Sequence, residues 1–234
     1  MIRYGLICSK VLELYKMQST MRFPIEPCDV IEKLKDCRAI TYTQLAEWNG
    51  CDLSEVIRLN ESKAGCTHYE RATGRYLILW NDDPSDNNVP GRQRWTQAHE
   101  LGHVMLNHLP MSKVVKMAET RGRRGAIKEL EEEADQFAAT FLCPTPFYRA
   151  LNIYSVADIM NVFGLSEEAS NIRWSEYLRF RGAKRAPEET QWEDTMRSIF
   201  TLRKRAGRLY YPPFRYDHPR YSGIDVWREQ GEVI

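Results

Sequence analysis

The pentapeptide His99-Glu100-Leu101-Gly102-His103 constrains this chain of 234 residues more than any other feature. On a helix, His99 and His103 lie one turn apart on the same face, so two neutral imidazoles can bind one Zn²⁺ ion. Glu100 lies beside them, where its carboxylate can take a proton from a water molecule that the metal activates. The alternative is a chance pattern on an amphipathic helix, with histidines that are only packed or solvated. The pentapeptide therefore predicts a helix and, on it, half of a metal site.

A third ligand must come from another element, because catalytic zinc sites usually have three protein ligands. The metzincin arrangement is excluded, since it needs Gly and His where this chain has Leu106 and Leu109. The acidic run 131–133 offers a carboxylate on a following helix. Glu131 and Asp135 share a helical face, so Glu131 can bind the metal while Asp135 accepts the spare N–H of a ligand histidine. The alternative for the acidic run is a solvated turn near a helix N-terminus.

Apolar periodicity predicts two long helices, at 93–108 and 127–142, which must face each other for a metal to lie between them. Small residues on both, including Gly102, would let them approach closely. Upstream, a hairpin with strands at 67–71 and 76–80 is predicted. A substrate could add as an extra strand along 76–80 if that strand is a sheet edge.

Two linked motifs closely resemble the ImmA/IrrE family of metallopeptidases: the pentapeptide 99–103 and the run Glu131-x-x-Ala134-Asp135-x-Phe137-Ala138-Ala139. The lead-in segments 76–81 and 92–98 and the trailing Leu142-Cys143-Pro144 also fit, within a similarity that covers about residues 24–180. The family often has Met in place of Cys143. The resemblance implies an α+β fold: a zincin-like core of packed helices with a small antiparallel sheet, plus a mostly helical C-terminal region. It also implies metal ligands at His99, His103 and Glu131, with Glu100 as the catalytic base.

The resemblance further implies an activity. Some family members, found in bacteria, phages and mobile elements, cleave a helix-turn-helix repressor and thereby switch genes on. We expect a zinc-dependent endopeptidase that cleaves a specific protein substrate, foremost such a repressor. A His₂-carboxylate site also accepts Mn²⁺. Four side chains are candidates for stabilising the oxyanion: His68, Tyr69, Tyr76 and His108. A non-catalytic regulator that uses the same metal site is an alternative, and a DNA-binding regulator is another.

Along the chain we expect an N-terminal helix at 1–22, the metallopeptidase domain at 23–150, a helical region at 151–205 and a basic-aromatic tail at 206–234. Charged residues interrupt the apolar pattern of the first segment, so it is not a signal peptide. No apolar run approaches the roughly 20 residues of a membrane span, so we expect a cytoplasmic protein without a membrane partner. The net charge of +1 provides no overall attraction to nucleic acid.

The C-terminal part contains two features that bear on nucleic-acid binding. Segments 155–163 and 167–181 form a predicted pair of helices similar to a DNA-binding helix-turn-helix. Its second helix carries three arginines, among them Arg173, but two glutamates at its start disfavour contact with phosphate. Core packing or substrate docking is therefore favoured over DNA binding. The tail offers stacking and phosphate contacts, or a packing strip for the core or a partner, through Arg203, Lys204, Arg205, Arg208, Tyr210, Tyr211, Phe214 and Tyr216.

Overall fold

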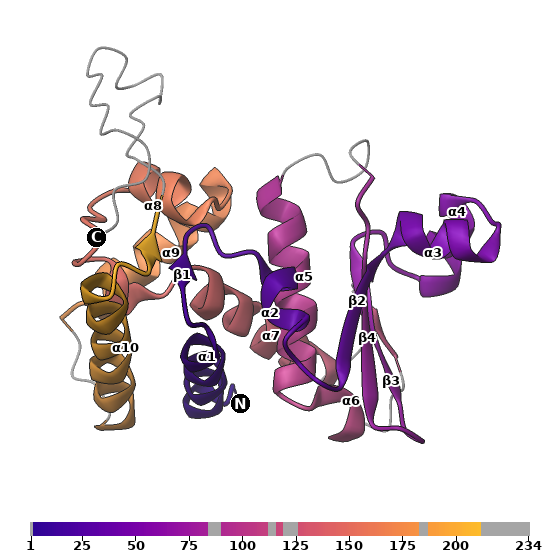
Figure 1. Ribbon diagram of the computed structural model, residues 1–234, viewed down its shortest axis with the longest axis horizontal. Helices are drawn as coiled ribbons and strands as arrows, with labels where there is room; N and C mark the ends of the chain where they lie inside the picture. The colour runs from indigo at the N-terminus through magenta and orange to yellow at the C-terminus, as the bar shows by residue number, and fades with distance from the viewer. Residues whose placement is uncertain (1, 84–89, 112–115, 119–125, 183–186, 212–234) are drawn as a thin grey trace, which may run out of the picture. The chain divides into compact units, whose positions relative to one another are not determined.

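A computed structural model gives the fold of the chain (Figure 1). It describes residues 2–83, 90–111, 116–118, 126–182 and 187–211. The predictions for most of the tail, including Phe214 and Tyr216, lie outside the described residues. Among the helices that are described, none combines the length and the apolar character needed to cross a membrane.

The chain divides into two compact units. One comprises residues 1–7 and 26–138, and the other comprises residues 8–25 and 139–234. The four-part division expected from the sequence stays a prediction, because compactness alone does not show which segments fold independently.

A four-stranded sheet forms one layer of the first unit, in the order β2-β4-β3-β5. Its strands are β2 (Cys37–Thr41), β3 (Gly65–Glu70), β4 (Arg75–Trp80) and β5 (Lys116–Ala118). The predicted hairpin is confirmed, since β3 and β4 pair antiparallel on either side of Gly74. The backbone of Gly74 has φ +72°, a left-handed conformation that glycine adopts at little cost.

The α+β fold class is confirmed, but the sheet is mixed rather than purely antiparallel. Strand β2 pairs in parallel with β4, whereas β3 pairs antiparallel with both β4 and β5. A parallel pair needs a long crossover, and the segment between β2 and β4 provides it through two helices and β3. Strand β4 is therefore central, and the prediction that 76–80 could be a sheet edge is wrong. Among the described strands, the edges are β2 and β5.

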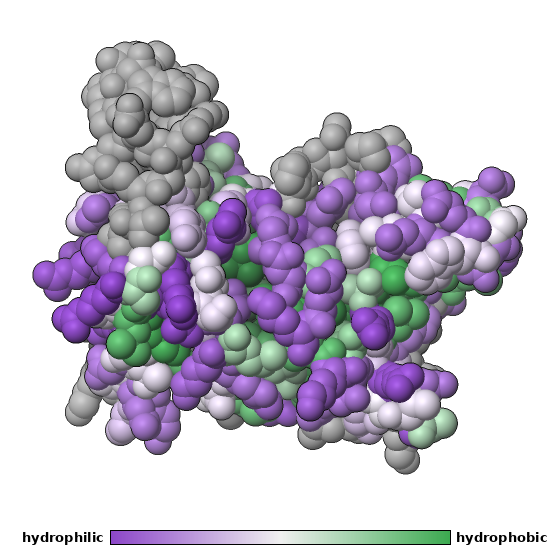
Figure 2. Space-filling model, in the orientation of Figure 1, coloured by the Kyte–Doolittle hydropathy of each residue, from purple (hydrophilic) through white to green (hydrophobic). Residues whose placement is uncertain are grey.

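The two faces of this sheet have different partners (Figure 1). Side chains alternate along a strand, and Thr67 of β3 points toward helix α5 (Pro90–Met105), where its hydroxyl meets Glu100. Its neighbour Cys66 points the other way, toward α3 (Tyr42–Asn49) and α4 (Leu53–Asn60). There the buried core consists of Tyr42, Ala46, Val56, Cys66 and Leu79. A pocket of about 840 Å³ opens on that side, and Figure 2 shows apolar surface next to it.

The two predicted long helices are present with one changed boundary. Helix α7 (Ala126–Leu142) agrees with the prediction, whereas α5 ends at Met105 instead of continuing to 108. Asn107 interrupts it, because its backbone adopts the left-handed φ of +56°, which asparagine tolerates better than most residues. A short helix, α6 (His108–Met111), follows at once. The backbone thus leaves the path of α5 at Asn107, four residues after the second histidine of the pentapeptide.

A glycine lets α5 and α7 approach each other. A Cβ atom added at Gly102 would lie 3.2 Å from the Cα of Ala134 and 3.2 Å from the ring of Phe137. Both distances are tighter than ordinary carbon contacts. The expectation that small residues permit a close approach of these two helices is therefore confirmed.

Where the structure describes it, the second unit is mainly helical and contains two short parallel strands, β1 (Met21–Arg22) and β6 (Leu209–Tyr210). Its helices include α1 (Tyr4–Met17, which begins in the first unit), α8 (Val156–Phe163), α9 (Glu167–Phe180) and α10 (Pro187–Arg205). Edge-to-face and tilted ring contacts build its core from Tyr15, Phe23, Phe147, Phe163 and Phe200. The predicted helix pair is confirmed as α8 and α9.

Arg173 of α9 belongs to this interior. It is 6% exposed, donates to the carbonyl oxygen of Cys143 at 3.0 Å and pairs with Glu176 at 2.7 Å. A guanidinium in such contacts is committed to packing and does not reach a phosphate backbone. This observation favours the core-packing interpretation of the helix pair.

Candidate metal centre

Three predicted ligand atoms converge between α5 and α7. The Nε2 atom of His99 lies 3.1 Å from Nε2 of His103 and 3.1 Å from Oε2 of Glu131. The third distance, from Nε2 of His103 to Oε2 of Glu131, is 3.7 Å. His99 and His103 are buried, and the side chain of Glu131 is 22% exposed. The structure therefore brings together one residue set from two helices, and this set is suited to hold a metal ion.

The spacing of these donors fits a small divalent cation. Ligands bound at 2.0–2.1 Å in a tetrahedron lie roughly 3.3 Å from each other, which is close to the three observed separations. The second oxygen of Glu131, Oε1, is buried and has no hydrogen-bond partner among the described residues. A buried carboxylate oxygen without a partner is costly unless a cation compensates it. The residues thus fit a metal ligated by two imidazoles and one carboxylate.

The charges of the three groups are strongly coupled. Burial by itself lowers the pKa of His99, but hydrogen bonds with Asp135 and Glu131 outweigh it and raise that pKa well above the ordinary value. Burial lowers the pKa of His103. Burial would raise the pKa of Glu131, yet the two neighbouring histidines lower it to about 2. In the metal-free protein a proton therefore lies between His99 and Glu131, and a bound metal must replace it.

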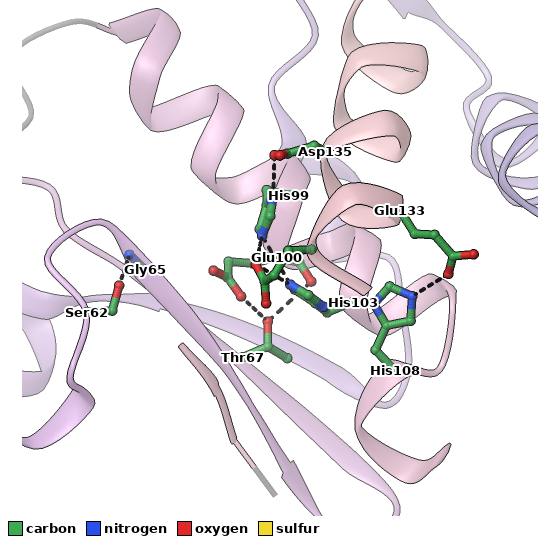
Figure 3. A network of polar contacts seen from close by, with 10 residues as sticks. Ser62, Gly65, Thr67, His99, Glu100, His103, His108, Glu133 and Asp135 are labelled. Atoms are coloured by element: carbon green, nitrogen blue, oxygen red, sulfur yellow. Dashed lines mark hydrogen bonds and ion pairs between the residues drawn. The ribbon is translucent and has the colours of Figure 1, made fainter. Parts of the chain in front are cut away.

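Glu100 lies beside His99 and His103 and is held by a contact with the sheet (Figure 3). It is 2% exposed, and its Oε2 accepts a hydrogen bond of 2.6 Å from the hydroxyl of Thr67 on β3. The same hydroxyl lies 3.2 Å from the backbone carbonyl of Glu100. Helix α5 thus supplies this carboxylate, and the sheet fixes its direction. The pentapeptide alone could not show the contribution of Thr67.

Asp135 lies on α7, one helical turn beyond Glu131. Its Oδ1 is 2.9 Å from Nδ1 of His99, and 57% of its side chain is exposed. A carboxylate only accepts hydrogen bonds, so Nδ1 of His99 donates and the opposite nitrogen faces the centre.

A second chain of contacts, absent from the sequence-based prediction, leads away from His103 (Figure 3). The Nδ1 atoms of His103 and His108 are 2.8 Å apart, and Nε2 of His108 is 3.1 Å from Oε2 of Glu133. Arg3, near the N-terminus, donates to Glu133 through both its backbone and its guanidinium. These hydrogen bonds from Arg3 are the main reason that the pKa of Glu133 falls to about 2. Burial lowers the pKa of His108 to about 3.

On an unbroken helix, His108 would point about 140° away from His103, so spacing alone gave no reason to join them. The left-handed turn at Asn107 instead brings the ring of His108 back into contact with His103. The only available signal was an asparagine placed between two histidines and followed by Pro110.

The four oxyanion candidates occupy different places. His68 lies on the opposite face of the sheet, within 3.0 Å of Asn60. His108 is fully buried in its contacts with His103 and Glu133. Tyr69 and Tyr76 pair across β3 and β4 with ring centres 4.8 Å apart, and the hydroxyl of Tyr76 lies 3.2 Å from Asn107.

Comparison with known proteins gives this centre a context. A search of the curated proteins finds no match. A family model does match, over residues 58–175, and its description is the IrrE N-terminal-like domain of a peptidase family. The matched half of the chain contains all three converging donors, Glu100 and Asp135. The chain belongs to this family of metallopeptidases with an IrrE N-terminal-like domain.

Proposed function

We propose that the protein is a zinc-dependent endopeptidase of the cytoplasm that cleaves a specific protein substrate, a helix-turn-helix repressor. The observation that carries the proposal is the buried carboxylate of Glu100 beside the three converging donors. A site that only stabilises the fold has no need of a further acid there. His99, His103 and Glu131 would hold Zn²⁺, or Mn²⁺, for which this donor set is also suited.

The residues of the chain divide the work of peptide hydrolysis. The metal, when bound, supplies Lewis-acid activation of water and of the scissile carbonyl. Glu100 takes the proton of the attacking water on its carboxylate and passes it to the leaving amine. Thr67 keeps that carboxylate in one orientation through the 2.6 Å hydrogen bond. Asp135 orients the ring of His99 by accepting a hydrogen bond of 2.9 Å from its Nδ1.

The substrate would meet the sheet at an edge. Strand β5 is the edge nearer to Glu100, since its Met117 pairs with Thr67, the residue that contacts Glu100. An extended segment of substrate could add to β5 through backbone hydrogen bonds, as peptides commonly do at open edges. Docking at β5 takes the place of docking along β4, which was expected only if β4 were an edge strand.

The test compares Glu100→Gln with Glu132→Gln, a matched change on α7. Glu132 is 45% exposed and pairs with Lys128 at 3.6 Å, away from the centre. Each protein is incubated with the repressor encoded beside it, with and without a chelator. We expect Glu100→Gln to keep its zinc and lose cleavage by at least about 100-fold, and Glu132→Gln to cleave normally.

Cleavage by zinc-loaded Glu100→Gln at the normal rate would contradict the mechanism. Zinc binding without any cleavage by the unaltered protein would favour the non-catalytic regulator. Salt-sensitive DNA binding without cleavage would favour the DNA-binding alternative.

A further inference from the structure

The contacts behind His103 form a continuous buried chain. His103 and His108 meet through their Nδ1 atoms at 2.8 Å, and Nε2 of His108 meets Glu133 at 3.1 Å. The backbone N–H of Arg3 donates to Oε1 of Glu133 at 2.8 Å, and its Nε donates at 2.9 Å. His103, His108 and Glu133 are each no more than 3% exposed. Water is therefore excluded from the links between them.

The direction of each hydrogen bond follows from the end of the chain. Glu133 is ionised and already compensated by Arg3, so it can only accept, and Nε2 of His108 must donate. A positive charge on fully buried His108 would have no counter-charge of its own, which makes it costly. His108 is therefore neutral, and its Nδ1 accepts.

The next link is then determined. A hydrogen bond between two ring nitrogens needs one donor and one acceptor. Because Nδ1 of His108 accepts, Nδ1 of His103 carries the proton and donates. The other nitrogen of His103, Nε2, is left with its lone pair, and this is the atom that lies among the three converging donors.

We propose that His108 and Glu133, anchored by Arg3, fix His103 as its Nδ1–H tautomer and thereby hold its Nε2 lone pair toward the metal site. The inference rests on the proposed function, because that lone pair matters only if a cation binds. His108 and Glu133 are positioning residues that act through His103. Through these hydrogen bonds Arg3, which is 130 positions away from Glu133 in the sequence, also supports the centre.

The test uses the full chain and two readouts. Imidazole ¹⁵N chemical shifts of the metal-free protein report the tautomer of His103, and competition with a chelator reports the affinity for Zn²⁺ alone. The variants are His108→Leu, which removes the acceptor, His108→Gln, whose amide can both accept and donate, and Glu133→Gln. Glu132→Gln on the same helix is the control, and circular dichroism monitors folding.

We expect the Nδ1–H tautomer in the unaltered protein and a mixture of tautomers in two variants. His108→Leu has no acceptor for His103, and Glu133→Gln has a single amide oxygen, for which the donors of Arg3 and His108 compete. The Zn²⁺ affinity of both variants should fall about 10–100-fold, the usual effect of removing a group that orients a ligand. His108→Gln should recover most of that loss, and Glu132→Gln should show none. If His108→Leu does not fold, Arg3→Ala tests the same link, because the side chain of Arg3 is 34% exposed and its removal leaves no cavity in the interior.

The two proposals fail in different ways. An unaltered protein that binds no Zn²⁺ would contradict the proposed function. The tautomer measured on metal-free protein would still show whether His108 and Glu133 fix the ring of His103. Another outcome is that the unaltered protein binds Zn²⁺ while the variants keep both its affinity and the Nδ1–H tautomer. In that case the role of His108 and Glu133 as positioning residues is wrong, and the proposed function stands. An Nε2–H tautomer in the metal-free unaltered protein would also overturn the positioning chain.

Discussion

The two histidines of the candidate metal centre are supported in opposite ways. Behind His99 there is one residue, Asp135, whose side chain is 57% exposed. Behind His103 there are three residues, and two of them, His108 and Glu133, are buried. Near the surface, water can replace a lost carboxylate, so one acceptor suffices. In the interior every polar atom needs a protein partner and every charge a counter-charge, so the support extends until it reaches Arg3.

The buried and the exposed support of the two histidines should differ most in what they contribute to the free energy of unfolding. In the metal-free protein, Glu133→Gln removes a buried carboxylate that compensates Arg3, and we expect it to cost about 1–3 kcal/mol of the free energy of unfolding. Asp135→Asn keeps an acceptor for His99 and changes an exposed ion pair, so we expect the smaller loss, about 1 kcal/mol or less. Urea unfolding with a chelator present measures both. Equal losses would show that the interior chain is no more important to the fold than the surface contact.

The two histidines should also differ in how protons compete with the metal for them. The pKa of His99 is raised, so His99 carries a proton in the metal-free protein, whereas the lowered pKa of His103 leaves that ring neutral. A metal must therefore displace one proton. Below the pKa of His99, each fall of one pH unit should weaken Zn²⁺ affinity about tenfold, because protons compete with the metal there.

Chelator competition at several pH values measures this slope. Asp135→Asn should flatten it near neutral pH, since Asp135 helps to raise the pKa of His99. A slope near a hundredfold per pH unit would mean that both rings are protonated, and the contrast between the two sides would then be wrong.

The same contrast explains what could be read from the sequence. Helical spacing relates His99 to His103 and Glu131 to Asp135 within single helices. The three converging donors and the support of His99 by Asp135 were therefore predictable from local periodicity. The support of His103 depends instead on a left-handed turn at Asn107 and on Arg3, which is far away in the sequence. Helical spacing does not encode such contacts, and the asparagine between the two histidines gives at most the turn, not the partner in Glu133 or Arg3.

The sheet teaches a similar lesson. The hairpin of β3 and β4 follows from two neighbouring strands and a glycine turn, and it was predicted. The parallel pairing of β2 with β4 depends on a crossover that includes the helices of 42–60. That segment has mixed sequence character, so the central place of β4 could not be predicted.

A substitution at the close contact between α5 and α7 should change the stability of the protein only modestly. Gly102 precedes His103, and a Cβ atom there would lie 3.2 Å from the Cα of Ala134, a backbone atom that cannot turn aside. Overpacking costs about 1–3 kcal/mol, and the better helix propensity of alanine returns up to about 1 kcal/mol. We therefore expect Gly102→Ala to destabilise the protein by about 1 kcal/mol in urea unfolding. Gly5→Ala in α1, where an added Cβ meets nothing within 4 Å, is the control and should be neutral or slightly stabilising. If both variants behave alike, the two helices have room to separate, and the position of His103 then depends on its polar chain rather than on close packing.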